Sequence, residues 1–154
     1  MPLILFVCTA NRYRSPIAEA CFKRQLEKHF SNGEWDVCSA GTWTTDGLPP
    51  TPEAIEAAQQ MGLDIQTHRS REVSKVLIDR SGLTLVMEHG HKEALQQEFP
   101  GQREKIFLLS EVIRGEPSDI PDPMADPSIG DVSEEICKLI EDGFESVLAL
   151  ANNK

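Results

Sequence analysis

The sequence has few of the features that mark membrane, secreted or nucleic-acid-binding proteins. No apolar run approaches the roughly 20 residues of a membrane span, and the first apolar stretch, residues 3–7, is too short for a signal-peptide core. Lys and Arg number 15 against 25 Asp and Glu, a net charge of −10, whereas phosphate backbones and anionic membranes select basic surfaces. These absences predict a cytoplasmic protein that binds neither nucleic acid nor a membrane.

Cysteine is also sparse. The four cysteines are scattered, with no C-x-x-C pair and no histidine at zinc-finger spacing: Cys8, Cys21, Cys38 and Cys137. A chain of 154 residues holds a core without disulfides. We therefore expect the last three to be small buried hydrophobic side chains.

Apolar runs and helical patterns alternate along the whole chain. We predict strands at residues 3–7, 35–38, 83–87 and 105–109. We predict helices from Ser15-Pro16, through residues 54–61, in a short segment capped by Ser70, through 91–99, and from Asp131 to the end. Strands joined by helices favour a parallel sheet covered on both faces. Residues 1–154 are thus expected to form one α/β domain, a three-layer sandwich with a four-stranded parallel sheet.

The residues that carry chemistry lie between the first predicted strand and the first helix. Ligands of open α/β sheets bind at such a turn, where N–H groups and the helix dipole attract anions. Cys8 begins the turn, where this field favours the nucleophilic thiolate. Arg14 can return across the turn and grip an anion with two N–H groups, and Ser15 can cap the helix or hydrogen-bond the thiolate. The pattern predicts a cradle for a phosphate or sulfate anion above a nucleophile.

Three segments resemble the low-molecular-weight protein tyrosine phosphatases, and the resemblance covers nearly the whole chain. Residues Val7 to Glu19 resemble that family's nucleophile loop, Ser39-Ala40-Gly41-Thr42 the exit of its second strand, and His68-Arg69-Ser70-Arg71 its His-Arg/Lys-Ser-Arg segment. The resemblance implies a flavodoxin-like, phosphotyrosine phosphatase I-like fold. It also implies hydrolysis of phosphomonoesters, protein phosphotyrosine above all or a small aryl phosphate, through a phosphocysteine intermediate. No metal or cofactor is implied, because an arginine and backbone N–H groups supply the positive charge.

The resemblance also implies a role for each residue of the loop. Cys8 is the nucleophile, Arg14 the clamp on the transition state, and Ser15 the group that stabilises the departing thiolate. Asn11 would hold the loop backbone, supported from behind by Ser39 and His68.

The general acid has two candidates. Asp122-Pro123 and Asp126-Pro127 both match the Asp-Pro of the family's general-acid loop. Asp122 has the better upstream match and is favoured, whereas Asp126 lies at the more usual distance from the last helix.

The chain departs from the family pattern around the substrate slot. Tyr13 replaces a frequent second cysteine, Ala10 replaces the usual glycine, and no tyrosine follows either Asp-Pro pair. A flat aromatic substrate would then be held by the loop and one tryptophan: Thr9, Ala10, Asn11, Arg12, Tyr13 and Trp43, with Met124 a further candidate.

Three other functions compete with a tyrosine phosphatase. An arsenate reductase of the same fold would need further cysteines in a mobile segment, and residues 80–91 contain none. Phosphoarginine phosphatases resemble this loop but carry a small threonine where this chain has Arg12, a cation that would repel a guanidinium substrate. A non-catalytic phosphate-binding module is disfavoured because Cys8, Arg14 and Ser15 are all present.

Overall fold

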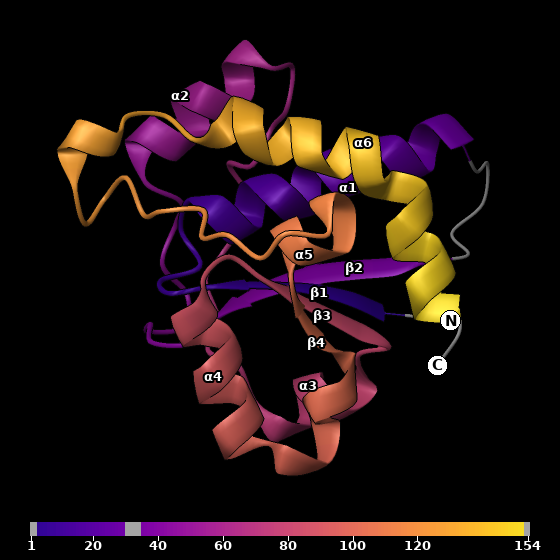
Figure 1. The fold of residues 1–154 in the computed structure, drawn as a ribbon. Coiled ribbons are helices and arrows are strands. Elements are labelled where there is room, and N and C mark those ends of the chain that lie inside the picture. Colours follow the sequence, from indigo (N-terminus) through magenta and orange to yellow (C-terminus); the bar gives the residue numbers. More distant parts are fainter. Residues whose placement is uncertain (1–2, 30–34, 153–154) are drawn as a thin grey trace.

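The computed structural model describes residues 3–29 and 35–152, which are built around a parallel β-sheet (Figure 1). Its strands are β1 (Leu3–Cys8), β2 (Asp36–Gly41), β3 (Leu83–Val86) and β4 (Ile106–Leu108), in the spatial order β2-β1-β3-β4. In the register, Leu3 lies opposite Asp36 of β2, and Ile4 lies opposite Leu83 of β3. The next strand in the sequence, β2, therefore pairs on one side of β1, and the later strands β3 and β4 are added on the other side. This is the switch point at which open parallel sheets bind ligands.

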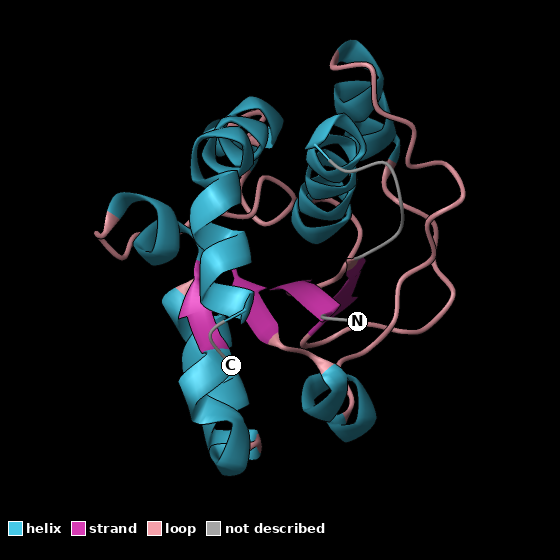
Figure 2. Ribbon diagram, turned by 90° about the vertical axis from the view of Figure 1, so that its right-hand side faces the viewer, coloured by secondary structure: helices cyan, strands magenta, loops and turns pink. Residues whose placement is uncertain are grey.

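Helices cover both faces of the sheet (Figures 1 and 2). One face carries α1 (Arg14–His29), α2 (Pro52–Gln60), α5 (Leu109–Arg114) and α6 (Ser133–Asn152), and the other carries α3 (Lys75–Arg80) and α4 (His89–Glu98). Two 3-10 helices, Pro100–Lys105 and Pro127–Ile129, complete the elements of the described chain. The predicted three-layer α/β architecture is confirmed. No helix among the described residues is long and apolar enough to cross a membrane.

The central position of β1 explains its continuous apolar sequence. Alternate side chains enter two separate cores: Ile4 and Phe6 pack beneath α1 and α6, whereas Leu5 and Val7 pack with residues of α3 and α4. All six residues of the strand are buried. A strand covered on both faces has no position for a polar side chain, so its carboxyl end and Cys8 are held rigidly.

Two local predictions were wrong. Ser70 does not cap a helix, because the segment after it runs beside the end of β2, with Val73 N–H donating to the Gly41 carbonyl. Ser74 caps α3 instead, accepting a hydrogen bond from Leu77 N–H. The fourth strand ends at Leu108, because Leu109 already begins the short helix α5, which the apolar run had concealed.

The prediction for two of the cysteines was also wrong. Cys21 of α1 and Cys137 of α6 form a disulfide, with Cα atoms 5.6 Å apart, because the two helices pack side by side. Cys38 is a free, buried thiol, as expected, and burial raises its pKa to about 11.

Candidate active site

The loop between β1 and α1 is held in a strained conformation by its surroundings. Asn11 has φ +58°, and it is the only non-glycine residue with positive φ in the described parts of the chain. Its side chain donates to Ser15 Oγ (2.8 Å) and Ser39 Oγ (3.0 Å) and accepts from Arg71 N–H (3.0 Å). The ring of His68 donates to the Asn11 carbonyl at 2.8 Å. Asparagine tolerates the left-handed region better than most residues, and these bonds fix it there.

The end of β2 presses directly against this loop. Thr42 and Trp43 N–H groups donate to the carbonyls of Cys8 and Thr9, at 2.9 and 3.0 Å. A Cβ atom added to Gly41 would lie 2.5 Å from the Thr9 carbonyl oxygen. Glycine at this position therefore allows the two segments to approach closely.

Ser15 joins the loop to the sulfur of Cys8. The Ser15 hydroxyl oxygen accepts from Asn11, so its own hydrogen is available to Cys8 Sγ, 3.0 Å away, with the Ala40 carbonyl farther off at 3.5 Å. Both Cys8 and Ser15 are buried. A hydroxyl so placed stabilises negative charge on sulfur.

Arg14 is buried, with only 1% of its surface exposed. Hydrogen-bond acceptors surround its guanidinium group. One terminal nitrogen donates to Glu88 Oε2 and to the Ile120 carbonyl, at 2.5 and 2.8 Å. The other lies 3.3 Å from Thr9 Oγ1 and 3.6 Å from Asp122 Oδ2. The group is thereby oriented at the start of α1, next to the nucleophile.

His91 is a second buried neighbour of this group. Its Nδ1 accepts from Glu88 N–H, so the proton of the neutral ring is on Nε2, which donates to Thr9 Oγ1 at 2.8 Å. Burial, and next the charge of Arg14, lower the pKa of His91 to about 4. His91 is therefore neutral at physiological pH and adds no second cation to the site.

Sequence reasoning missed both Glu88 and His91. A signal for Glu88 was available, since it follows a buried strand and the carboxyl ends of parallel strands meet at one edge of the sheet. The contact of His91 with Thr9 crosses 82 residues of sequence and has no local signature.

A cavity of about 110 Å³ opens above Cys8. The residues around it come from the loop, from the start of α2 and from the segment before α6: Cys8, Ala10, Arg12, Tyr13, Arg14, Thr51, Asp122 and Met124. Of the residues predicted to bind substrate, Thr9 and Asn11 do not line the cavity, whereas Ala10, Arg12, Tyr13 and Met124 do. Trp43 is not among them, and 83% of its surface is exposed.

The two candidate acids lie in different surroundings. Asp122 is at the cavity wall, near the guanidinium of Arg14. Asp126 is exposed and accepts from Ser128 N–H and Oγ, at 3.0 and 2.7 Å, as the N-cap of the 3-10 helix Pro127–Ile129. These hydrogen bonds hold the pKa of Asp126 below its usual value.

Comparison with known proteins gives a consistent family. The model of a family described as low molecular weight phosphotyrosine protein phosphatase matches residues 3–154. A protein-arginine-phosphatase of Bacillus subtilis is 34% identical over 145 residues, covering 94% of this chain and 91% of its own. A probable low molecular weight protein-tyrosine-phosphatase of Ralstonia nicotianae, EpsP, is 35% identical over 120 residues, with 78% and 77% covered.

Solved structures agree with this result. The YwlE arginine phosphatase from Geobacillus stearothermophilus superposes with a TM-score of 0.85 at 29% identity, covering 97% of this chain and 94% of that one. A YwlE mutant with a phosphorylated active-site serine superposes with a TM-score of 0.77 at 30% identity, covering 98% and 94%.

Proposed function

Because the chain belongs to the low molecular weight phosphotyrosine protein phosphatase family, we propose that it dephosphorylates phosphotyrosine in proteins, with Cys8, Arg14 and Asp122 performing the chemistry. The protein is a hydrolase, and the phosphorylated serine mutant of a relative supports a phosphoenzyme intermediate. The observation that carries the assignment is that a thiol, a guanidinium and a carboxyl group surround one cavity. The proposal includes one phosphatase domain over residues 1–154, acting in the cytoplasm.

In the first step, Cys8 Sγ attacks phosphorus and the bond from phosphorus to the tyrosine oxygen breaks. Asp122 gives its proton to that oxygen, so tyrosine leaves as a neutral phenol. Arg14 and the N–H groups at the start of α1 stabilise the charge on the phosphoryl oxygens. Since Glu88 and the Ile120 carbonyl hold one end of the guanidinium, Arg14 does not have to reorganise during the reaction.

In the second step, water attacks the phosphocysteine. Asp122, now ionised, accepts a proton from the water, the sulfur–phosphorus bond breaks, and inorganic phosphate forms. Cys8 leaves as a thiolate, which the hydrogen of Ser15 Oγ stabilises from 3.0 Å. Ser39 and His68 act through Asn11, by keeping the loop in its strained conformation.

Substrates with different leaving groups test the choice of Asp122. Asp122→Asn should lower kcat on a phosphotyrosine peptide by about 10²–10⁴, the usual contribution of a general acid. The loss should be smaller on p-nitrophenyl phosphate, because p-nitrophenolate leaves without being protonated. Steady-state kinetics of both substrates measure the difference.

Asp126→Asn is the matched control, and Cys8→Ser gives the level without a nucleophile. Should Asp126→Asn show the leaving-group dependence instead, Asp126 is the acid and our assignment is wrong. Equal phosphate release by wild type and Cys8→Ser would refute the cysteine mechanism itself.

Arginine phosphatases among the relatives make phosphoarginine the second candidate substrate. Arg12 argues against it, because this cation lies at the wall of the cavity, with its Nε donating to the Pro49 carbonyl at 2.7 Å. A second cation would be repelled there.

Arg12→Thr should therefore raise kcat/KM for a phosphoarginine peptide about fivefold or more, relative to a phosphotyrosine peptide of the same sequence. Arg69→Thr, a change of an exposed arginine outside the cavity, is the control. A wild-type preference for the phosphoarginine peptide would replace our first candidate with the second.

A further inference from the structure

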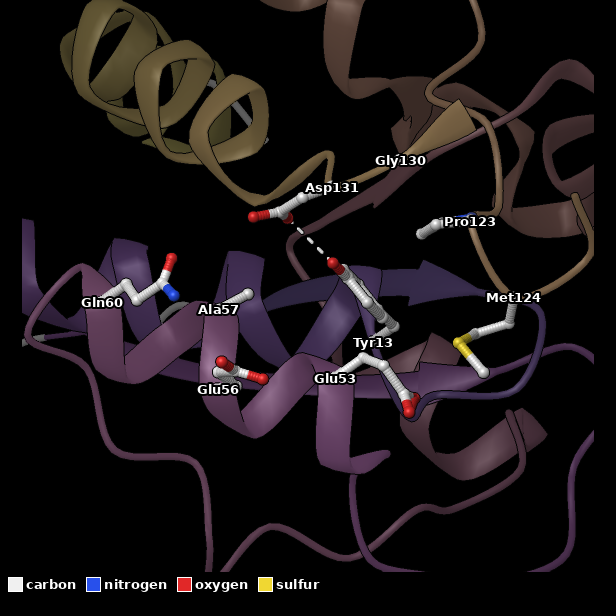
Figure 3. Close-up of a pocket in the computed structure, with 9 residues that line it drawn as sticks. All are labelled: Tyr13, Glu53, Glu56, Ala57, Gln60, Pro123, Met124, Gly130 and Asp131. Atoms are coloured by element: carbon white, nitrogen blue, oxygen red, sulfur yellow. Dashed lines mark hydrogen bonds between the residues drawn. The ribbon is translucent and has the colours of Figure 1, made fainter. Parts of the chain in front are cut away.

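A second, larger cavity of about 360 Å³ adjoins the one above Cys8 (Figure 3). Tyr13 and Met124 line both cavities, so a group bound over the nucleophile has this space beside it. One wall is a single face of α2, and the opposite wall is the segment before α6: Glu53, Glu56, Ala57 and Gln60 face Pro123, Met124, Gly130 and Asp131. Its volume is within the range of pockets that hold small ligands or single side chains.

The charged groups of this cavity are all acidic. Glu53, Glu56 and Asp131 line it, and no Lys, Arg or His does. None of the three carboxylates has an ion-pair partner within residues 3–29 and 35–152. Burial raises the pKa of Asp131, but hydrogen bonds from Ser133 and Tyr13 outweigh it and leave the pKa below its ordinary value. The cavity is therefore negative at neutral pH, whereas its neighbour holds the guanidinium groups of Arg12 and Arg14 beside Asp122.

The remaining lining suits a long aliphatic chain. The ring of Tyr13, the thioether of Met124 and the Cβ of Ala57 are apolar surfaces between the carboxylates. Lysine and arginine side chains bury their methylene groups on such surfaces while the charged end meets an acid. A cation near the Tyr13 ring gains a further attraction.

We propose that this cavity binds the side chain of a lysine or arginine that lies close to the phosphorylated residue in the substrate polypeptide. The inference rests on the proposed function, because the phosphoryl group must occupy the cavity above Cys8. The two cavities then favour a substrate that carries a phosphate next to a basic side chain. The phosphate lies over Arg14, and the basic side chain lies between α2 and Asp131. Glu53 and Glu56 are specificity-determining residues that take no part in bond breaking.

Peptide binding to a protein that cannot turn over tests the proposal. Cys8→Ala removes the nucleophile, and its affinity is measured for phosphotyrosine peptides in which one lysine is moved through the three positions on either side of the phosphoresidue. An otherwise identical peptide without lysine is the reference. We expect one or two lysine positions to lower the Kd about twofold to fivefold, the range of partly exposed ion pairs.

The gain should depend on the two glutamates. Adding Glu53→Gln and Glu56→Gln to the Cys8→Ala protein should remove most of the gain in affinity that the lysine gives. The charge reversals Glu53→Lys and Glu56→Lys should instead favour a peptide with glutamate at the same position. Glu93→Gln with Glu98→Gln is the matched control. These exposed acids of α4 lie on the opposite face of the sheet, and replacing them removes the same amount of charge. The control should keep the lysine preference.

A flat lysine profile, or a preference that survives the Glu53→Gln and Glu56→Gln changes, would overturn the subsite. The proposed function is judged separately, by hydrolysis of p-nitrophenyl phosphate by the wild-type protein. Absence of turnover there would refute the phosphatase, while the affinities would still decide whether the acidic cavity selects a basic side chain.

Discussion

Arg14 is a cation that the protein interior holds only because acceptors surround it. Glu88, the Ile120 carbonyl and Thr9 Oγ1 meet its N–H groups, and this pairing offsets the cost of burial. His91 completes the arrangement as a neutral ring, since burial and the charge of Arg14 keep its pKa near 4. A protonated ring would place a second positive charge beside the guanidinium.

The depressed pKa of His91 predicts a loss of stability in acid. Between about pH 6.5 and 4 the unfolded chain binds a proton at this histidine and the folded protein does not. Stability therefore rises with pH through this window and falls on acidification. A shift from 6.5 to about 4 corresponds to at most about 3 kcal/mol of unfolding free energy. Urea unfolding at a series of pH values measures it.

His91→Gln is the test of this assignment, because its amide keeps a hydrogen-bond donor but does not titrate. The acid loss of stability should shrink in this variant. His29→Gln, at an exposed position of α1 outside the site, is the matched control. If His91→Gln kept the wild-type dependence of unfolding free energy on pH, groups other than His91 would be its cause.

At the scale of elements, the site depends on how closely β2 approaches the loop after β1. The parallel pairing places Cys8 opposite Gly41. The next two N–H groups after β2 then donate hydrogen bonds to the carbonyls of Cys8 and Thr9. The end of β2 thus supports the first residues of the loop, and Ser39 of the same strand accepts a hydrogen bond from the strained Asn11.

Gly41→Ala should consequently damage activity by moving the loop. The added Cβ would lie 2.5 Å from the Thr9 carbonyl oxygen, a backbone atom that cannot rotate away. We expect a stability loss of about 1–3 kcal/mol, typical of overpacking, together with a larger proportional loss in kcat/KM for p-nitrophenyl phosphate. Gly82→Ala is the control, since its nearest neighbour would be 3.7 Å away. Equal activity of the two variants would contradict the close approach.

At the scale of the whole molecule, the ends of the chain are joined through the packing of α1 against α6. The Cys21–Cys137 disulfide links residues 116 positions apart, so it closes most of the chain into a loop. Because α1 begins with Arg14 and Ser15, this link anchors the helix that carries part of the site. A disulfide of this span constrains the unfolded state strongly.

Loss of this disulfide should destabilise the protein by about 2–5 kcal/mol. Cys21→Ala with Cys137→Ala should lower the unfolding midpoint, and a reductant should lower that of the wild type but not that of the variant. Thiol titration of the unfolded protein should find two thiols before reduction, from Cys8 and Cys38, and four after it. Four thiols without reductant would show that the bond does not form.

Local patterns accounted for most elements and for the centre of the site. The apolar run of β1 and the Ser-Pro at the start of α1 are signals confined to a few residues, and the cradle between them follows from strand and helix ends. Ser70 shows the limit of this reasoning. Its side chain accepts from Leu48 N–H and donates to the Thr45 carbonyl, and these contacts overrode a plausible cap.

The sequence by itself determined the alternation of strands and helices, the position of Cys8 at the end of a buried strand, and the family. Only the tertiary structure decided which groups meet there: Glu88 and His91 around Arg14, the Cys21–Cys137 pair, and the acidic wall beside Tyr13. The physical reason is the distance along the sequence between the interacting residues. Strand and helix signals arise between near neighbours in the chain, whereas these contacts join segments that are adjacent only after the sheet and its helices have packed.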